Sequence, residues 1–188
     1  MANTIRAFFA ISLSPEVSQT IALIIEQLKQ QIPPRKVRWV NAKHLHITLR
    51  FIQAVKLADL PIICEQVALH LKTIKAFKLE LNEIELFPKP KCPRLITVKV
   101  GPEEPLAFIS YQLAQILDAL NYPTEKRAFR GHITLGRLQN YLPSTDIFQE
   151  IQQPVFPQQV AQCINLLQSK LEKNQREYLL IKQFCLQS

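Results

Sequence analysis

The sequence predicts an α+β fold in which one structural unit occurs twice. The tetrapeptide His-Ile-Thr-Leu stands at residues 46–49 and again at 132–135, and its two copies contain half of the four histidines in the chain. In each half an apolar segment, a helix-periodic segment and the tetrapeptide follow one another in that order. His46 and His132 are 86 positions apart, and Pro15 and Pro105, which begin the two helical segments, are 90 apart. A repeat of about half the chain indicates an internal duplication rather than a solenoid.

The elements of the first half follow from hydrophobic periodicity. An apolar run at 5–13 predicts a strand, and residues 16–30 carry apolar residues at helical spacing. Ser14 is a good N-cap and Pro15 suits the first helical position. The first tetrapeptide lies in a predicted strand at 44–52.

Residues 57–75 are then expected to form a helix. Residues 77–87 alternate as a strand with a shift near Glu83. The proline-rich segment 87–93 is predicted to be the crossing between the two halves.

The second half repeats this order. A β-branched run at 94–100 predicts a strand, 105–120 a helix, and 130–138 the second motif strand. A short helix at 144–152 and strands at 158–171 and 177–186 complete the prediction.

Strand alternation places the polar residues of each motif on one face. His44, His46, Thr48 and Arg50 are expected to share a face, with the apolar residues between them on the core side. In the second copy the same period groups the polar residues Arg130, His132 and Thr134 with Gly136. The two faces together predict a cationic groove that holds two imidazoles and two hydroxyls.

These residues resemble a known family. The paired His-x-Thr-Leu motifs, their spacing, Phe87-Pro88 and Arg130 are similar to the 2H phosphoesterase superfamily, specifically its RNA 2′,3′-cyclic phosphodiesterases, also called 2′-5′ RNA ligases. The resemblance runs over essentially the whole chain. It implies a bilobal fold in which two antiparallel sheets face each other across a central groove, with helices outside. Gln53 and Gly131 depart from the glycine and proline that are frequent in this family near the two motifs.

The motif residues suit acid/base chemistry. Opening a cyclic phosphodiester with water needs one group that takes a proton from water and one that protonates the leaving oxygen, and histidine can do both near neutral pH. We therefore expect His46 and His132 to be catalytic, with the hydroxyls of Thr48 and Thr134 binding phosphoryl oxygens. The initial hypothesis assigns His132 as the base and His46 as the acid, although the near symmetry allows the reverse. The resemblance implies a 2′-phosphate product.

Other polar and aromatic residues are open to two interpretations. Arg130 and Arg50 are expected to bind substrate, and Arg137 is a further groove residue. His44 is placed at the groove edge, whereas His70 is interpreted as an ordinary helix residue. Trp39 and Tyr122 precede the motif strands and either stack a base or fill the core.

Composition limits the classes of function. The net charge of +8 and a pI near 9.5 favour a polyanionic partner. Three glycines, Gly101, Gly131 and Gly136, cannot build a phosphate-binding glycine loop. Carboxylates do not accompany the motif histidines on the same face, so we expect no metal and no cofactor. The four cysteines, at positions 64, 92, 163 and 185, lie far apart and are expected to be incidental thiols.

The expected protein is a single domain of two pseudo-symmetric lobes over residues 1–188. It is expected to be a cytoplasmic monomer without an obligate protein partner or a membrane span, acting on RNA that ends in a 2′,3′-cyclic phosphate or on a small cyclic-phosphate nucleotide. Two alternatives stay open: a non-catalytic RNA- or nucleotide-binding module, and a phosphodiesterase of the same superfamily that acts on another cyclic phosphate.

Overall fold

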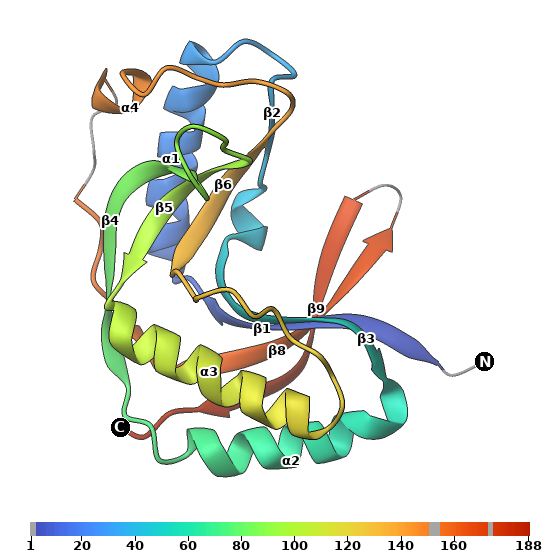
Figure 1. Cartoon of the computed structure of the whole chain (residues 1–188). Coiled ribbons are helices and arrows are strands. Elements are labelled where there is room, and N and C mark those ends of the chain that lie inside the picture. Colours follow the sequence, from blue (N-terminus) through green and yellow to red (C-terminus); the bar gives the residue numbers. More distant parts are fainter. Residues whose placement is uncertain (1–2, 151–154, 173–174) are drawn as a thin grey trace.

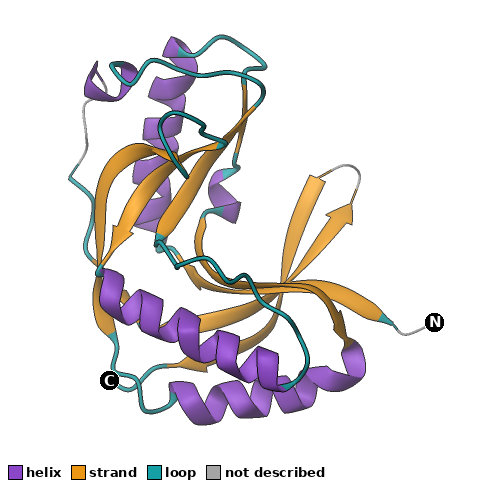
Figure 2. Ribbon diagram, in the orientation of Figure 1, coloured by secondary structure: helices purple, strands orange, loops and turns teal. Residues whose placement is uncertain are grey.

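The computed structural model describes residues 3–150, 155–172 and 175–188. Its strands form a curled antiparallel sheet with two halves, and the helices lie outside (Figures 1 and 2). The α+β class predicted from the sequence is therefore confirmed.

Strand order explains how the two halves meet. Hydrogen bonding follows the order β7-β4-β5-β6-β3-β1-β8-β9, with β2 paired to β6. Strands β3 and β6 pair at Ile47 and Ile133, so the two expected sheets are continuous at the motif strands. The strands are β1 (Thr4–Ser12), β2 (Val37–Trp39), β3 (His46–Lys56), β4 (Phe77–Phe87), β5 (Leu95–Gly101), β6 (His132–Leu138), β7 (Gln159–Ala161), β8 (Cys163–Glu172) and β9 (Gln175–Cys185).

The helices cover the outer faces of the halves. In Figure 1, α1 lies behind β5 and β6, while α2 and α3 lie beneath β1, β3 and β8. Ser14 caps α1, since its hydroxyl accepts the backbone N–H of Val17, as the sequence predicts. The α-helices are α1 (Pro15–Gln31), α2 (Leu60–Leu71), α3 (Glu103–Ala119) and α4 (Ile147–Glu150), and 3₁₀ turns occupy Ala42–His44 and Leu57–Asp59. The helix expected at 144–152 extends past the described residues.

Three connections differ from the sequence prediction. Phe87 pairs with Leu95, so the proline-rich segment is the turn between neighbouring strands β4 and β5, and its assignment as the crossing is wrong. The chain passes between the two halves of the sheet several times, and one of these passages is the short stretch 72–76, which joins α2 to β4. The strand expected at 158–171 is divided into β7, which pairs with β4, and β8, which pairs with β1.

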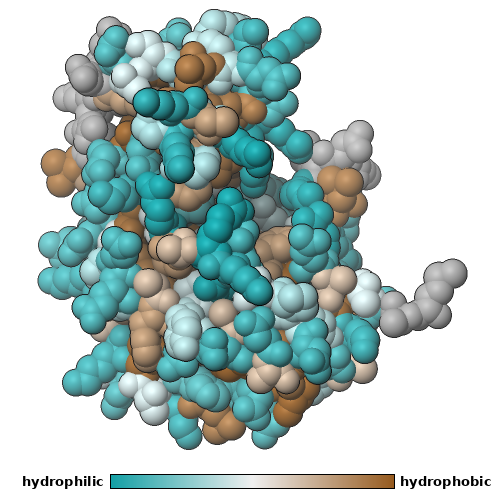
Figure 3. All heavy atoms as spheres, viewed as in Figure 1, coloured by the Kyte–Doolittle hydropathy of each residue, from teal (hydrophilic) through white to brown (hydrophobic). Residues whose placement is uncertain are grey.

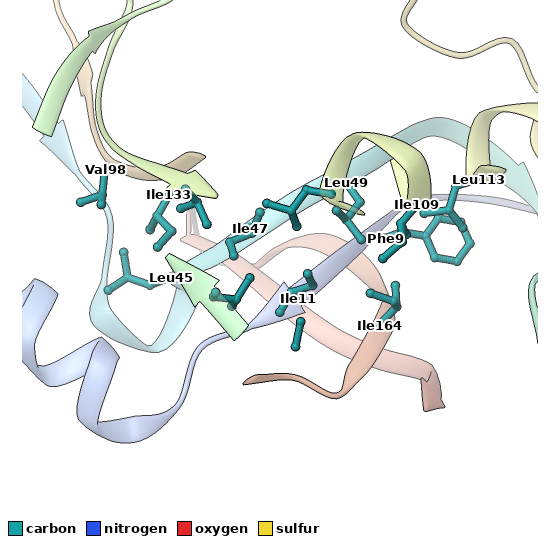
Figure 4. Packing of buried hydrophobic residues seen from close by; sticks show 14 of the residues in the cluster. Phe9, Ile11, Leu45, Ile47, Leu49, Val98, Ile109, Leu113, Ile133 and Ile164 are labelled. Atoms are coloured by element: carbon teal, nitrogen blue, oxygen red, sulfur yellow. The ribbon is translucent and has the colours of Figure 1, made fainter. Parts of the chain in front are cut away.

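The hydrophobic core lies directly behind the two motifs. Leu45, Ile47, Leu49 and Ile133 point into the same cluster as Ile109 of α3 (Figure 4). Ile47 and Ile133 are fully buried. The motif strands are thus fixed from behind by packing, which leaves their polar side chains on the opposite face.

Candidate active site at the two histidine motifs

The two motifs meet about a local two-fold axis. Ile47 and Ile133 lie opposite each other in antiparallel register. Because the strands are antiparallel, the residues next to that pair also face each other: His46 lies opposite Thr134, and Thr48 lies opposite His132. All four side chains leave the strands on the face away from the two isoleucines. The arrangement therefore places the histidine of each motif across from the threonine of the other.

Both imidazoles are anchored in the same way. Nδ1 of His46 lies 2.7 Å from the carbonyl oxygen of His44, and Nδ1 of His132 lies 2.8 Å from that of Arg130. A carbonyl oxygen only accepts hydrogen bonds, so Nδ1 carries the proton in each ring and the neutral ring has its lone pair on Nε2. Nε2 of His46 lies 2.9 Å from Oγ1 of Thr48, whose hydroxyl donates to it in this state.

Aromatic side chains fix the planes of these rings. Phe8 of β1 packs on His46 at a centroid distance of 4.9 Å, and Tyr178 of β9 meets it edge-on at 5.3 Å. Phe87 stacks on His132 at 4.4 Å. Each histidine thus has at least one hydrogen bond and at least one aromatic contact that restrict its rotation, as pre-organised acid/base groups require.

Burial lowers the pKa of both motif histidines below its usual value, because the charged imidazolium loses hydration. The hydrogen bond to the carbonyl opposes this effect in each case. The charge on His132 further lowers the pKa of His46, whereas the Glu85 carboxylate partly restores that of His132. Protonation of one ring therefore disfavours protonation of the other.

A cavity of about 630 Å³ opens beside His46, Thr48 and Thr134. The face drawn in Figure 3 is hollowed between the two halves, and hydrophilic side chains gather around the hollow. None of the lining residues is acidic. The cationic members of the lining are Arg6, Arg38, Lys43, Arg137 and Arg176, and the aromatic members besides the motif rings are Phe8, Trp39, Phe51 and Tyr178. The prediction of a cationic groove is supported by this lining.

The placement predicted for Arg50 is wrong. The register between β1 and β3 shifts between Phe9 and Ala10, so that Phe9 pairs with Arg50 and Phe8 with Phe51. This bulge reverses the alternation after Thr48, so Phe51 lines the cavity while Arg50 turns toward α3. There its guanidinium donates to the carbonyl oxygens of Ser110 and Glu125, at 2.8 and 2.7 Å.

Arg130 lies beside the second histidine but is already engaged. Its guanidinium donates to both oxygens of Glu85, at 3.1 and 3.2 Å, and to the carbonyl of Pro88 at 2.9 Å. It also covers the Phe87 ring at 4.8 Å. Arg130 does not line the cavity described above. A contact between Arg130 and the substrate therefore stays a proposal.

The remaining sequence candidates divide between the groove and the core. Trp39, Arg137 and His44 line the cavity. Tyr122 is buried and its hydroxyl donates to Asp59, so it is a packing residue. His70 bonds its own helix through the carbonyl of Gln66.

Sequence reasoning missed the contributions of β1 and β9. Arg6 and Phe8 line the cavity from β1, and the i, i+2 spacing within the first apolar run was the available signal. Arg176 and Tyr178 come from β9, which reaches the motif through β8 and β1. No local pattern connects that last hairpin to His46.

The described residues contain no group of three or more His, Cys, Asp or Glu side chains placed to hold a metal ion. Within the same part of the chain, no helix is long and apolar enough to cross a membrane.

Comparison with known proteins gives consistent similarities. The family model for LigT-like phosphoesterases matches residues 11–97. A protein of Archaeoglobus fulgidus named RNA 2′,3′-cyclic phosphodiesterase is 27% identical over 167 residues, which cover 88% of this chain and 92% of the relative. A Methanocaldococcus jannaschii protein of the same name is 28% identical over 182 residues, 95% of this chain and 99% of the relative.

Solved structures share the fold. A crystal structure of E. coli LigT complexed with 3′-AMP superposes with a TM-score of 0.82 at 22% identity, covering 99% of this chain and 100% of the other. The apo form of E. coli LigT gives a TM-score of 0.77 over 98% of this chain and 99% of the other, also at 22% identity.

Proposed function

We propose that this chain is a LigT-like phosphoesterase, in line with the family model that matches residues 11–97 and with the two relatives above, and that it hydrolyses the 2′,3′-cyclic phosphodiester at RNA 3′ ends to a 2′-phosphate. The observation that carries the proposal is the mirrored anchoring of His46 and His132 on backbone carbonyls two residues upstream. This anchoring fixes Nε2 as the reactive nitrogen of both rings. A binding module needs no such pair of proton-transfer groups.

Several findings support a nucleotide substrate. Both relatives described above are named RNA 2′,3′-cyclic phosphodiesterase. The E. coli protein of the same fold has been crystallised with 3′-AMP, a nucleoside monophosphate. The cationic lining of the cavity suits the phosphates of such a ligand.

In the proposed mechanism the cyclic phosphate binds between the two motifs. The hydroxyls of Thr48 and Thr134 donate to its non-bridging oxygens and stabilise the charge that builds there. One neutral imidazole accepts a proton from the attacking water, and the other, protonated, donates to the departing 3′ oxygen. The anionic phosphate favours the charged form of a nearby imidazole and so offsets the burial that lowers both pKa values in the free protein.

The electrostatics favour His132 as the acid and His46 as the base, the reverse of the initial hypothesis. Glu85 supports a positive charge on His132. Apart from the hydrogen bond to the carbonyl of His44, the influences on His46 all lower its pKa. His46 is therefore the ring that stays neutral and accepts the proton of water.

The same groups serve the reverse reaction. Attack by a 5′-hydroxyl in place of water would join two RNA ends through a 2′-5′ bond, and microscopic reversibility assigns the proton transfers to the same two histidines. We include this ligation in the proposal as a secondary activity. We also retain a cytoplasmic monomer as its cellular form, with Arg130 as a rim contact for the substrate.

The proposal is tested by incubating wild type, His46→Ala and His132→Ala with nucleoside 2′,3′-cyclic phosphates and with a short RNA ending in a cyclic phosphate, in EDTA. We expect wild type to form 2′-phosphate and each variant to lose about 10²- to 10⁴-fold in kcat. The matched control is His70→Ala, which removes a histidine outside the site and should keep full activity. A folded wild type that leaves every substrate intact would contradict the proposal.

A further inference from the structure

Two cysteines that take no part in the proposed catalysis, and that are separated in the sequence, are neighbours in the structure. Cys163 begins β8 and Cys185 ends β9, and the two residues are direct partners in the antiparallel register. Their sulfurs lie 3.1 Å apart, with the thiol of Cys163 donating to Sγ of Cys185. Both thiols are free. The pair therefore holds two reactive sulfurs in contact.

Backbone geometry permits a covalent bond between them. The backbone N–H of Leu186 donates to the carbonyl of Gln162 at 2.8 Å, which makes these two residues a hydrogen-bonded pair. The adjacent pair, Cys163 and Cys185, is then of the non-hydrogen-bonded type, in which opposite Cα atoms lie about 4.5 Å apart and side chains approach closely. This separation falls within the range of about 4.4 to 6.8 Å that disulfides span.

We propose that Cys163 and Cys185 form a reversible cross-strand disulfide when the protein meets a small-molecule disulfide such as oxidised glutathione. Cys185 is exposed and Cys163 half-buried, so Cys185 reacts first. Its thiolate attacks one sulfur of oxidised glutathione and releases one glutathione thiolate. Cys163 then loses its proton, attacks Sγ of Cys185 and releases the second glutathione. The two cysteines are oxidised and one glutathione disulfide is reduced, so electrons balance.

The pKa of the half-buried cysteine agrees with this order. Burial and the neighbouring thiol raise the pKa of Cys163 to about 11. Cys163 is therefore protonated at neutral pH and is a poor first nucleophile. It becomes effective in the second step because its target sulfur is already in contact.

The bond would secure an edge of the sheet. β9 is the terminal strand in the sheet order. Just beyond Cys185, Leu186 is buried, and Gln187 exchanges backbone hydrogen bonds with Ile74 and Ala76, in one of the segments that cross between the halves. The disulfide would therefore resist separation of the C-terminal segment from β8 and from this crossing.

The catalytic groove should be unaffected. Arg176 and Tyr178, the cavity residues of β9, lie toward the opposite end of the β8–β9 pair, near Ser169. A bond at the Cys163 end changes nothing that contacts His46. Oxidation is thus expected to raise stability without changing turnover.

The test compares wild type, Cys185→Ser, Cys163→Ser and the control Cys92→Ser, each as the full chain, after incubation with oxidised glutathione. We expect a peptide linking Cys163 to Cys185 in both wild type and Cys92→Ser. In Cys92→Ser, which lacks the other exposed thiol, the intact mass should also fall by two hydrogens. The unfolding midpoint of both proteins should rise by about 5 to 10 °C, reversibly with dithiothreitol. Cys163→Ser should instead keep one glutathione on Cys185, because the second step is blocked.

Two results would overturn the inference. One is oxidised wild type that carries stable glutathione on Cys185 without the cross-linked peptide. The other is full alkylation of both cysteines after oxidation of folded protein. Because these readouts are mass and stability, they are independent of whether the proposed hydrolysis occurs.

Discussion

Replacing Arg50 tests whether the bulge in β3 turns this side chain toward α3 and away from the groove. Its guanidinium makes two charge-assisted hydrogen bonds, to the carbonyls of Ser110 in α3 and Glu125 in the following loop. Such bonds contribute about 1.5 to 3 kcal/mol each, and the one to the exposed loop belongs at or below the lower end. Arg50→Met should therefore reduce the free energy of unfolding by about 2 to 4 kcal/mol and the unfolding midpoint by about 5 to 15 °C.

The matched variant is Arg137→Met, which removes an exposed cation from the cavity lining. It should leave the unfolding midpoint within a few degrees and lower kcat/KM for a short RNA substrate. Arg50→Met, assayed well below its own midpoint, should keep the wild-type kcat/KM. Calorimetry and initial rates on the same preparations separate these patterns. If Arg50→Met is as stable as wild type and loses kcat/KM like Arg137→Met, then Arg50 belongs to the groove and the argument from the bulge fails.

Three further predictions concern the threonines, the pH profile and a glycine. Thr48→Val and Thr134→Val keep the shape of the side chain and remove one hydroxyl each, so kcat should fall by about 10²-fold while thermal unfolding is unchanged. A fall in kcat of less than about threefold, on the order of one weak hydrogen bond, would show that the threonine hydroxyls take no part in the mechanism. Wild-type kcat/KM should be bell-shaped against pH, with its acidic limb below pH 6.5, because burial lowers the pKa of the base, His46. Glu85→Gln should move the alkaline limb to lower pH, because the Glu85 carboxylate raises the pKa of His132. An alkaline limb that does not move would exclude His132 as the acid. Gly131→Ala would place Cβ 2.5 Å from the carbonyl oxygen of Val100, so we expect a loss of about 1 to 3 kcal/mol by chemical denaturation, and an unchanged midpoint would show that the strand can shift.

The sequence was sufficient for the motif strands and for their chemical face. Period-two alternation correctly separates His46 and Thr48 from Ile47 and Leu49, because the strand is regular over this stretch and one face is buried. The same rule fails two residues later. One extra residue in the pairing with β1 reverses the alternation, and the apolar pattern around Phe51 does not reveal it.

Long-range pairing accounts for the other gaps. The proline-rich segment after Phe87 has the composition of a crossing, yet it closes a hairpin because β4 and β5 pair on either side of it. Tyr178 reaches His46 only because β9 joins the sheet through β8 and β1. The contact between Cys163 and Cys185 has the same origin. Such neighbours depend on strand order, which a single sequence does not specify locally.

The most direct test of the two-histidine account is a change of leaving group. A cyclic substrate with sulfur in place of the 3′ oxygen needs little protonation as it departs, so an enzyme without its general acid should regain activity on it. Wild type, His46→Ala and His132→Ala are compared on the oxygen and sulfur substrates by single-turnover rates. The account predicts that sulfur restores His132→Ala to near the wild-type rate and leaves His46→Ala slow. Rescue of His46→Ala alone would exchange the two roles, and rescue of neither would contradict acid/base catalysis by this pair.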